Sequence, residues 1–549
     1  MGFRGAGASR GGGQAGATLR TTPARAQAGG SVGGVVDLPV PPRPTPPPGT
    51  ASPGTASPGT ASPAGAATKV VAPSVADLSG RQPAATTLRE LRASGHVHRS
   101  VRAELRDNLL ARMAAGENRF PGIVGFDDTV LPQVERALLA GHDIVFLGER
   151  GQGKTRLIRT LVGLLDEWSP AVAGCEINDH PYAPVCGRCR ALLAELAEQL
   201  PVVWRHRDER FGEKLATPDT SVGDLIGDVD PVKVAEGRTL GDPETVHYGL
   251  VPRCNRGVFS VNELPDLAER IQVALLNVLE ERDIQVRGYL LRLPLDLLLV
   301  ASANPEDYTN RGRIITPLKD RFGAEVRTHY PLRLDDELRL IKQEAVLAWT
   351  GSPLGAPVLP DHLVEIVARF TRLVRDAPQV DQRSGVSARL AVAAAETVAA
   401  SAVRRAALTG EDVPTARVVD LASIVPAVRG KVEFEALEEG REDEILTHLL
   451  RRAIAETYRA RLAGTDLAGL QKRFDAEGPV ETGDLVTAAE LLRRVGPVPG
   501  LAGMLTKLGV DGAESPGLAA AALELAMEGL HLNRRLAKEE LPGRTVYGG

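Results

Sequence analysis

IVFLGERGQGKT at Ile144–Thr155 is the stretch that decides the fold. Four apolar residues, enough for a buried strand, lead directly into Gly148–Thr155, which fits the pattern G-x-x-x-x-G-K-S/T. A helix is expected to follow from about Lys154 to Trp168. A strand, a glycine-rich loop and a helix in this order cradle phosphate groups, because the N–H groups of the loop and of the helix N-terminus point at them. The stretch therefore predicts a nucleotide site.

The side chains of this loop have distinct expected roles. Lys154 is expected to reach the β- and γ-phosphates, and the Thr155 hydroxyl is expected to ligate Mg²⁺. ATP and Mg²⁺ are therefore the expected cofactors. The other residues of this stretch that are expected to contact the nucleotide are Gly148, Glu149, Arg150, Gly151, Gln152, Gly153 and Arg156.

Two later strands are expected to bring catalytic groups to the loop. The apolar run in GVFSVNELPDL at 257–267 ends in Asn262-Glu263, where nucleotide hydrolases usually carry two acids. Glu263 is the expected general base, whereas Asn262 joins the nucleotide-binding set without the charge that would strengthen Mg²⁺ binding. Both hydrolysis and nucleotide binding without turnover remain open. Asn304, at the tip of LLLVASANPEDY, is expected either to orient the attacking water or to act only as a turn or cap residue.

The order of elements around these motifs predicts an α/β fold. Strand-like apolar runs alternate with helical stretches up to about residue 330, which is typical of a P-loop NTPase with a three-layer parallel sheet. Beyond Pro331 the periodicity is helical. The predicted divisions are a disordered Gly/Pro/Ala-rich tail at 1–85, an αβ nucleotide-binding core with preceding helices at 86–330, an all-α lid at 331–430 and an extra C-terminal helical region at 431–549.

Composition indicates a globular chain with an unstructured beginning. Hydrophobic residues make up 43% and charged residues 25% of the 549 residues. The first 66 residues hold 15 Gly and 11 Pro, which leaves too little apolar surface to offset the cost of ordering them. The sequence contains no uninterrupted apolar run of about 18 residues. We therefore expect no membrane insertion and a cytoplasmic location.

The motifs as a set resemble those of an AAA+ ATPase. Gly148–Thr155, Glu263 and Asn304, in this order, are similar to the branch that contains the magnesium chelatase ATPase subunit and the MoxR-like ATPases. The resemblance covers about residues 118–430. It includes the helix-2 insertion at 221–259 and a hairpin before the sensor strand, and it implies an AAA+ core followed by a helical lid.

The resemblance also implies roles for residues outside the loop. Ile123 and Val124 would line the adenine pocket. Arg321, in PLKDRFGAEV, would be an arginine finger that reaches the γ-phosphate of a neighbouring subunit, the alternative being a surface salt bridge. Arg389, in SGVSARLAVAAAETV, would sense the nucleotide within its own subunit, with Arg383 as the competing choice.

Three of the four cysteines lie within fifteen residues. GCEINDHPYAPVCGRCR places Cys175, His180, Cys186 and Cys189 at a spacing that suits a tetrahedral structural Zn²⁺. His180 is the weakest of these expected ligands, and Cys254 is its alternative. The competing interpretation is a set of reduced, partly buried thiols.

The implied function is an ATP-hydrolysing motor that remodels or activates a partner protein. From the resemblance we expect a homo-oligomeric ring, a hexamer, and a partner with a von Willebrand A domain. Three alternatives remain: a magnesium chelatase ATPase subunit proper, a nucleotide-gated scaffold with little hydrolysis, and a nucleic-acid motor. Residues 101–549 carry 55 basic and 67 acidic side chains, which argues against nucleic acid as the partner.

Overall fold

The computed structural model describes most of the chain after its first 79 residues. Of two compact units, Met1–Ala72 and Pro73–Gly549, only the second is described. The predicted tail therefore lies outside the described residues up to residue 79. Within 80–548, the residues not described are 230–231, 233–234, 236–244, 281–283, 287–288, 292, 306–312, 348–353, 511–514 and 542.

Five parallel strands form the central sheet. In spatial order they are β11 (Ala324–Arg327), β1 (Ile144–Leu147), β10 (Leu297–Ala303), β7 (Gly257–Asn262) and β4 (Phe211–Leu215). β1 therefore lies between two strands that come much later in the chain. Because all five strands run in the same direction, their carboxyl ends meet at one edge of the sheet, which is where parallel sheets bind ligands.

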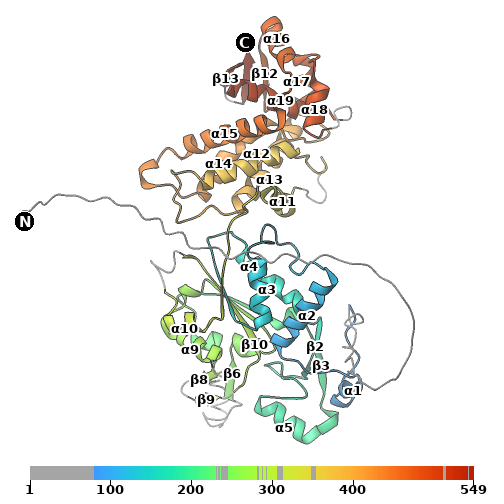
Figure 1. Ribbon diagram of the computed structural model, residues 1–549, viewed down its shortest axis with the longest axis vertical. Helices are drawn as coiled ribbons and strands as arrows, with labels where there is room; N and C mark the ends of the chain where they lie inside the picture. Colours follow the sequence, from blue (N-terminus) through green and yellow to red (C-terminus); the bar gives the residue numbers. More distant parts are fainter. Residues whose placement is uncertain are drawn as a thin grey trace, which may run out of the picture. The chain divides into compact units, whose positions relative to one another are not determined.

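The two faces of this sheet are covered by different helices (Figure 1). Ile144 and Phe146 belong to an apolar layer with α2 (Val101–Ala115), α3 (Leu131–Ala140) and α4 (Lys154–Thr160). Val145 and Leu147 belong to the opposite layer, with α9 (Glu269–Glu280) and α10 (Thr316–Arg321). Successive side chains of a strand point to opposite faces, so the four residues of β1 serve both layers. The predicted three-layer α/β core is confirmed.

The helix after the phosphate loop is shorter than the sequence pattern suggests. α4 ends at Thr160, and a 3-10 turn at Leu161–Leu164 follows it. Trp168, expected to end the helix, instead begins β2 (Trp168–Val172), which pairs antiparallel with β3 (Val202–His206). α5 (Gly187–Leu196) lies between these strands in the chain, and α1 (Leu88–Ala93) opens the described part.

Two small antiparallel sheets extend the core. β5 (Gly227–Val229) pairs with β6 (Val246–Tyr248), between α6 (Val222–Leu225) and α8 (Leu250–Arg253), within the predicted helix-2 insertion. β8 (Ile284–Val286) pairs with β9 (Tyr289–Leu291), which is the hairpin expected before the sensor strand β10. β5 and β8 are in contact, so the insertion and the hairpin lie side by side.

Helices dominate after residue 331, as predicted. The lid range contains α11 (Leu334–Glu344), α12 (Asp361–Arg375), α13 (Arg389–Thr409) and α14 (Ile424–Val428). Their apolar core continues into α15 (Glu442–Leu462) and α19 (Pro516–Leu532), because α12 packs on α15 and α15 packs on α19. The division at residue 430 therefore does not separate two cores. Among the described residues, no helix combines the length and the apolar character needed to cross a membrane.

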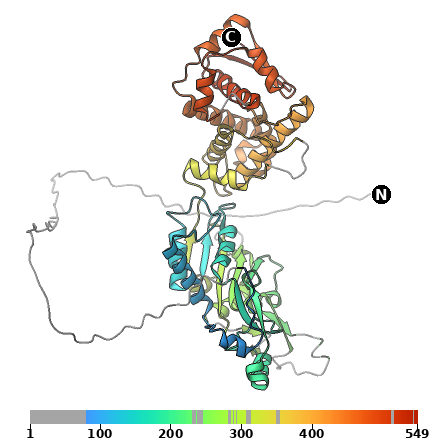
Figure 2. The same cartoon turned by 90° about the vertical axis from the view of Figure 1, so that its right-hand side faces the viewer.

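The C-terminal region also contains a sheet that the sequence pattern does not indicate. β12 (Val480–Gly483), β14 (Arg544–Gly548) and β13 (Ala537–Leu541) form three antiparallel strands in this order. Two buried glutamates of α19 hold the sheet, since Glu524 accepts a hydrogen bond from Thr482 and Glu528 accepts one from Tyr547. The region is drawn orange to red in Figure 2, and its other helices are α16 (Ala468–Glu477), α17 (Ala488–Val495) and α18 (Leu501–Lys507).

Candidate active site

The phosphate loop joins the carboxyl end of β1 to α4, in the predicted place. Two of its glycines are fixed by close approach. A Cβ on Gly151 would lie 1.9 Å from the Ser387 hydroxyl, and one on Gly148 would lie 2.0 Å from the Thr328 hydroxyl. Gly151 also has a φ of 71°, which side-chain-bearing residues rarely adopt. The loop is thus a backbone cradle of the kind that fits phosphate groups.

A hydrogen-bonded chain connects the loop to the two strand tips that were expected to carry catalytic groups. The Lys154 ammonium donates to Asn304 Oδ1 at 2.8 Å, and Asn304 Nδ2 donates to Glu263 Oε2 at 2.9 Å. Lys154 also donates to the carbonyls of Gly148 and Glu149, and it is 7% exposed. The predicted phosphate-binding lysine, water-orienting amide and general base are therefore brought together at one edge of the sheet.

Glu263 has an unusual backbone conformation. Its φ is 55°, in the left-handed region, directly after β7. A residue other than glycine held there costs about 1–3 kcal/mol, and such residues concentrate at functional sites. Its N–H donates to the Ser302 hydroxyl at 3.3 Å, which anchors it to β10. The strained turn directs the carboxylate toward Asn304.

Asn262 has a partner that sequence reasoning did not identify. Its Nδ2 donates to Glu213 Oε1 at 2.5 Å, and its Oδ1 accepts from the Ser302 hydroxyl at 3.3 Å. Glu213 lies on β4, next to β7, and also pairs with Arg159 of α4 at 2.8 Å. A carboxylate is therefore present beside the amide, but a neighbouring strand supplies it. Only the parallel pairing of β4 with β7 could have revealed this contact.

The outer part of the loop contacts the segment that leads to the lid. Gln152 Oε1 accepts hydrogen bonds from the Glu149 N–H at 3.1 Å and from the Thr328 hydroxyl at 2.8 Å. The Tyr330 hydroxyl donates to the Arg150 carbonyl at 2.8 Å. Burial and the nearby Glu149 carboxylate raise the pKa of Tyr330, which keeps its hydroxyl protonated as a donor. The expected nucleotide contacts Glu149, Arg150 and Gln152 thus have structural partners as well.

A hollow of about 320 Å³ opens beside this outer part of the loop. It is lined by Glu149 of the loop, by His329–Leu332 and by lid residues from α12 and the turn before α13. Arg375 of the lid lies 4.4 Å above the Tyr330 ring and pairs with Glu337 at 2.6 Å. The hollow therefore includes a residue of the phosphate loop, Glu149, in its wall.

The residues expected around the adenine lie on the entry segment. Ile123 and Val124 are half-buried, and Ile123 packs against the apolar layer of α2–α4. Arg156 approaches the same segment, because a Cβ on Gly122 would lie 2.9 Å from its guanidinium. Arg156 also forms an ion pair with Glu344 of α11. Arg156 is therefore positioned between the entry segment and the lid.

Arg321 occupies the end of α10, on the surface of the subunit. It pairs with Glu280 Oε1 at 2.9 Å and with Asp320 at 3.0 Å, and these carboxylates raise the pKa of its guanidinium. Within one chain Arg321 therefore forms a surface salt bridge, which was the predicted alternative to an arginine finger. A role toward a neighbouring subunit would require it to exchange these partners.

The two candidate sensor arginines differ in their contacts. Arg383 forms a double hydrogen bond with Asp381, at 3.0 Å to each carboxylate oxygen. Arg389 begins α13, two residues after Ser387, and its backbone N–H is capped by the Ser387 hydroxyl at 3.1 Å. Ser387 is also the residue that approaches Gly151 of the loop. The turn between Arg383 and Arg389 therefore approaches the loop through Ser387, and the start of α13 is anchored there.

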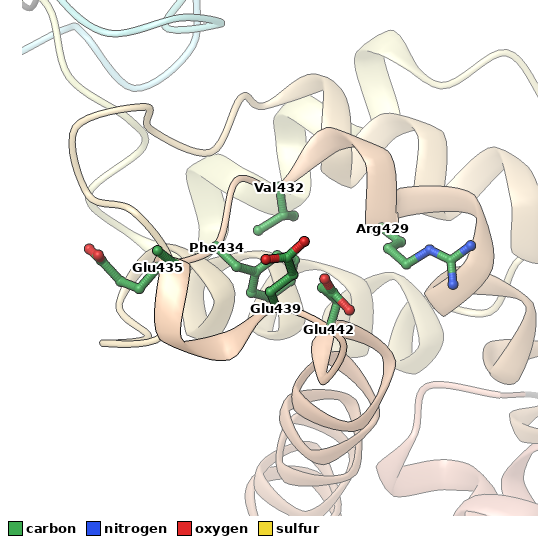
Figure 3. Close-up of a pocket in the computed structure, with 7 residues that line it drawn as sticks. Arg429, Val432, Phe434, Glu435, Glu439 and Glu442 are labelled. Atoms are coloured by element: carbon green, nitrogen blue, oxygen red, sulfur yellow. The ribbon is translucent and has the colours of Figure 1, made fainter. Parts of the chain in front are cut away.

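A second, larger hollow lies just after the predicted lid range and does not fit a nucleotide (Figure 3). Its volume is about 610 Å³, and it lies where the chain enters α15. Three glutamates line it, against one arginine, so it would repel phosphate groups. Its lining residues are Arg429, Val432, Phe434, Glu435, Ala436, Glu439 and Glu442.

The three clustered cysteines are brought together and are buried. Cys175 follows β2, Cys186 caps α5, and Cys189 lies in the first turn of α5. With Asp179 they form a group whose four ligand atoms all lie within 4.8 Å of one another. The thiols of Cys186 and Cys189 donate to Cys175, which lowers the pKa of the Cys175 thiol to about 3.

The structure corrects the expected fourth member of this group. His180 Nδ1 accepts the Tyr182 N–H at 3.0 Å, and its Nε2 lies 3.2 Å from Nε2 of His96. Burial lowers the pKa of His180, so its ring stays neutral within a cluster of rings rather than facing the thiols. Cys254 is also outside the group. The residue that joins the three thiols is Asp179, one position before the predicted histidine.

Known proteins that resemble this chain are subunits of magnesium chelatases. The chain is 29% identical over 228 residues to the magnesium-chelatase 38 kDa subunit of Rhodobacter capsulatus, a match that covers 41% of this chain and 59% of that subunit. It is 27% identical over 237 residues to the chloroplastic subunit ChlI-1 of Arabidopsis thaliana, covering 41% and 51%. The chain thus spans about half the length of these relatives. The resemblance to AAA+ ATPases of the magnesium chelatase branch is confirmed.

Family models and solved structures give weaker similarities than these relatives. No protein-family model matches the chain. A structure of the magnesium chelatase subunits BchI and BchD covers 60% of this chain and 98% of its own, at 22% identity and a TM-score of 0.31. The RuvB branch-migration motor of Thermotoga maritima covers 77% and 92%, at 14% identity and a TM-score of 0.30. The strand order of the central sheet and the phosphate loop after β1 define the fold.

Proposed function

We propose that this chain is a Mg²⁺-dependent ATPase of the AAA+ type whose hydrolysis cycle remodels or activates a partner protein. One observation carries the proposal: the chain of hydrogen bonds from Lys154 through Asn304 to Glu263. It joins a phosphate-binding cation to a carboxylate of the kind that activates water, through an amide that is bonded to both. The similarity to magnesium chelatase ATPase subunits supports the same conclusion.

Each group has a defined task in this proposal. Mg²⁺, held by Thr155 and the phosphates, supplies charge neutralisation when it is bound. Lys154 binds the β- and γ-phosphates, and Glu263 Oε2 takes the proton of the attacking water. Asn304 holds the carboxylate in place. Asn262 and Glu213 together would take the place of the single acid that nucleotide hydrolases usually carry after this strand, since the amide and the carboxylate are in direct contact.

We propose that the active site is completed by a neighbouring copy of the chain. Arg321 lies on the surface at the end of α10, which suits a guanidinium delivered across an interface. Arg389 acts within its own subunit, because Ser387 holds the start of α13 next to Gly151. A homo-oligomeric ring is the assembly that gives every subunit both contacts. A partner with a von Willebrand A domain is implied only by the family resemblance.

The first test compares ATP binding with phosphate release. We expect Glu263→Gln to bind Mg·ATP as tightly as the wild type but to lose about 10²–10⁴-fold in turnover, because the amide cannot accept the proton. The matched control is Glu539→Gln, which makes the same change on the exposed strand β13. Equal turnover in Glu263→Gln and the wild type would refute the assigned base. Tight ATP binding without turnover in the wild type would favour the scaffold instead.

A second candidate function is that of a magnesium chelatase ATPase subunit proper, which the names of the relatives favour. In that case the chain would support insertion of Mg²⁺ into a porphyrin when it replaces the corresponding subunit in a reconstituted chelatase. The exchange experiment separates the two functions, because a remodelling ATPase with another partner would hydrolyse ATP there without supporting metal insertion.

A further inference from the structure

The three thiols of Cys175, Cys186 and Cys189 and the Asp179 carboxylate come together in the loop between β2 and α5 and in the first turn of α5. Its donors are almost inaccessible, since Cys175 and Cys186 are 6% exposed, Asp179 is 1% exposed and Cys189 is fully buried. All four cysteines of the chain are free thiols. A hollow lined by Cys175 and five other residues opens beside this loop and offers a path from solvent. The group is therefore enclosed but reachable.

The backbone around the group is arranged to hold thiolates. The Asp179 N–H donates to the Cys175 sulfur at 3.3 Å, and the Cys189 N–H donates to the Cys186 sulfur at 3.3 Å. The second bond closes the turn CGRC so that two sulfurs face the same point. N–H groups directed at sulfur lower the cost of placing negative charge there.

Asp179 provides an independent sign that a ligand is expected. Its Oδ2 accepts hydrogen bonds from the N–H groups of Val185 at 3.1 Å and Cys186 at 2.9 Å. Its Oδ1 is buried and accepts no hydrogen bond from any described residue. A buried carboxylate oxygen without a partner is costly and calls for an ion or water. A carboxylate oxygen of Asp179 also lies within 4.8 Å of the three sulfurs.

We propose that Cys175, Asp179, Cys186 and Cys189 bind one Zn²⁺ as a closed structural site. Three sulfurs and one carboxylate oxygen are ligands that zinc accepts, and four protein ligands fill its tetrahedral coordination. The site is structural because no position is left for water or substrate. Binding displaces the remaining thiol protons to solvent, so that the three sulfurs bind as thiolates.

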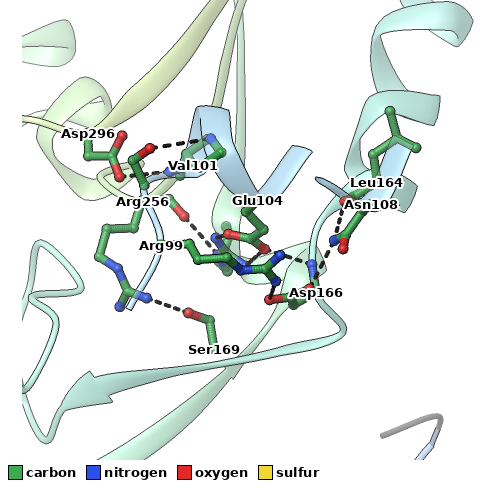
Figure 4. Close-up of polar contacts among 12 residues, drawn as sticks. Arg99, Val101, Glu104, Asn108, Leu164, Asp166, Ser169, Arg256 and Asp296 are labelled. Atoms are coloured by element: carbon green, nitrogen blue, oxygen red, sulfur yellow. Dashed lines mark hydrogen bonds and ion pairs between the residues drawn. The ribbon is translucent and has the colours of Figure 1, made fainter. Parts of the chain in front are cut away.

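A buried arginine lies beside the four negatively charged ligands of the proposed zinc site. Arg256, 8% exposed, donates to the carbonyls of Pro170 at 2.5 Å and Asn178 at 3.4 Å. It also donates to the Ser169 hydroxyl at 2.6 Å (Figure 4). Its guanidinium therefore lies on the loop that carries Asp179. A buried cation beside the ligand loop offsets part of the charge of three thiolates and a carboxylate.

The experiment measures zinc in the purified full chain by elemental analysis, after growth with added zinc. We expect about one zinc per chain in the wild type and in Cys254→Ser, which removes a buried thiol outside the group. Cys186→Ser and Asp179→Ala are expected to bind zinc at least about tenfold more weakly. Asp179→Cys, which offers a fourth thiolate, is expected to keep the metal.

Co²⁺ titration of the apo wild type tests the same site without any substitution, so a variant that misfolds does not decide the result. A thiolate-to-cobalt charge-transfer band together with the visible bands of a tetrahedral site is expected, with a changed band in Asp179→Cys. The proposal is overturned if the wild type, reduced and then supplied with Zn²⁺, holds no more metal than Cys186→Ser. Loss of zinc in Cys254→Ser equal to that in Cys186→Ser, or a disulfide among the three thiols in place of metal, would also overturn it.

Discussion

Asn262 stands where related hydrolases usually carry an acid, and its amide is bonded to the Glu213 carboxylate at 2.5 Å. Replacing the amide by a carboxylate would place two negative charges against each other at a site that is 8% exposed. We expect Asn262→Asp to lower the free energy of unfolding by about 1–3 kcal/mol, because a hydrogen-bond donor is lost and a like charge is gained. Urea denaturation of the apo chain measures it.

The control for this prediction is the double variant Glu213→Gln with Asn262→Asp. It restores one donor and one acceptor in reversed order, so it is expected to recover more than half of the lost stability. The prediction is wrong if Asn262→Asp is as stable as the wild type, or if adding Glu213→Gln makes it less stable still.

At the scale of residues, the sequence was sufficient to place a side chain in the candidate site where a motif fixes both the residue type and the element that carries it. Lys154, Glu263 and Asn304 could be selected because each follows an apolar run that ends at the same sheet edge. Glu213 could not, because β4 has too few apolar residues to stand out as a strand and the contact depends on its pairing with β7. Asp179 was not among the predicted ligands, because spacing does not say which side chain turns toward the thiols.

At the scale of elements, α12 contains a buried histidine that makes stability depend on pH. His362 is 1% exposed, and burial lowers its pKa to about 4, whereas in the unfolded chain it titrates near pH 6.5. Between pH 6.5 and pH 4, His362 binds a proton in the unfolded chain but not in the folded chain. The free energy of unfolding therefore falls as the pH drops from about 6.5 to about 4. Above pH 6.5 this contribution is constant.

We therefore expect His362→Leu to lose about 2 kcal/mol less stability between pH 7 and pH 5 than the wild type. The matched control is His448→Leu, at an exposed position of α15, which should keep the wild-type pH dependence. Urea denaturation at both pH values gives the comparison. Part of the dependence should survive in His362→Leu, because burial also lowers the pKa of His96 to about 4. An unchanged pH dependence in His362→Leu would contradict this account.

The sequence predicted long amphipathic helices better than short strands. α12 lies in the region where the periodicity predicts helices, because fifteen residues at helical spacing leave little ambiguity. The strands β12–β14 were missed because each has only four or five residues, with glutamates and lysine in β13. The predicted helix was extended to Trp168, the first residue of β2, because Trp168 continues an apolar pattern that a 3-10 turn in fact breaks.

At the scale of the whole molecule, the proposed ring predicts that two inactive variants can complement each other. Arg321→Ala lacks the group given to a neighbour, and Glu263→Gln lacks the base kept within the subunit. In mixed rings, a subunit with Arg321→Ala next to one with Glu263→Gln forms an intact site. Random mixing in equal amounts is expected to restore roughly a quarter of wild-type turnover, measured as phosphate release.

The control is a mixture of Arg389→Ala with Glu263→Gln. Arg389 and Glu263 are proposed to serve the same site in one subunit, so no exchange of subunits rebuilds it, and turnover should stay at the level of the separate variants. Recovery in this mixture, or no recovery with Arg321→Ala, would show that the two arginines have been assigned to the wrong sides of the interface.

The apolar core shared by α12, α15 and α19 has a mechanical consequence. The Tyr330 hydroxyl is bonded to the Arg150 carbonyl of the phosphate loop, and the Tyr330 ring lies under Arg375 at the end of α12. A helix embedded in one continuous core cannot turn alone, so any rotation started at Tyr330 carries the sheet of β12–β14 with it. In the proposed ATP cycle, α12, α15 and α19 would therefore move together as one body, and the displacement would be passed on to the strands at the end of the chain.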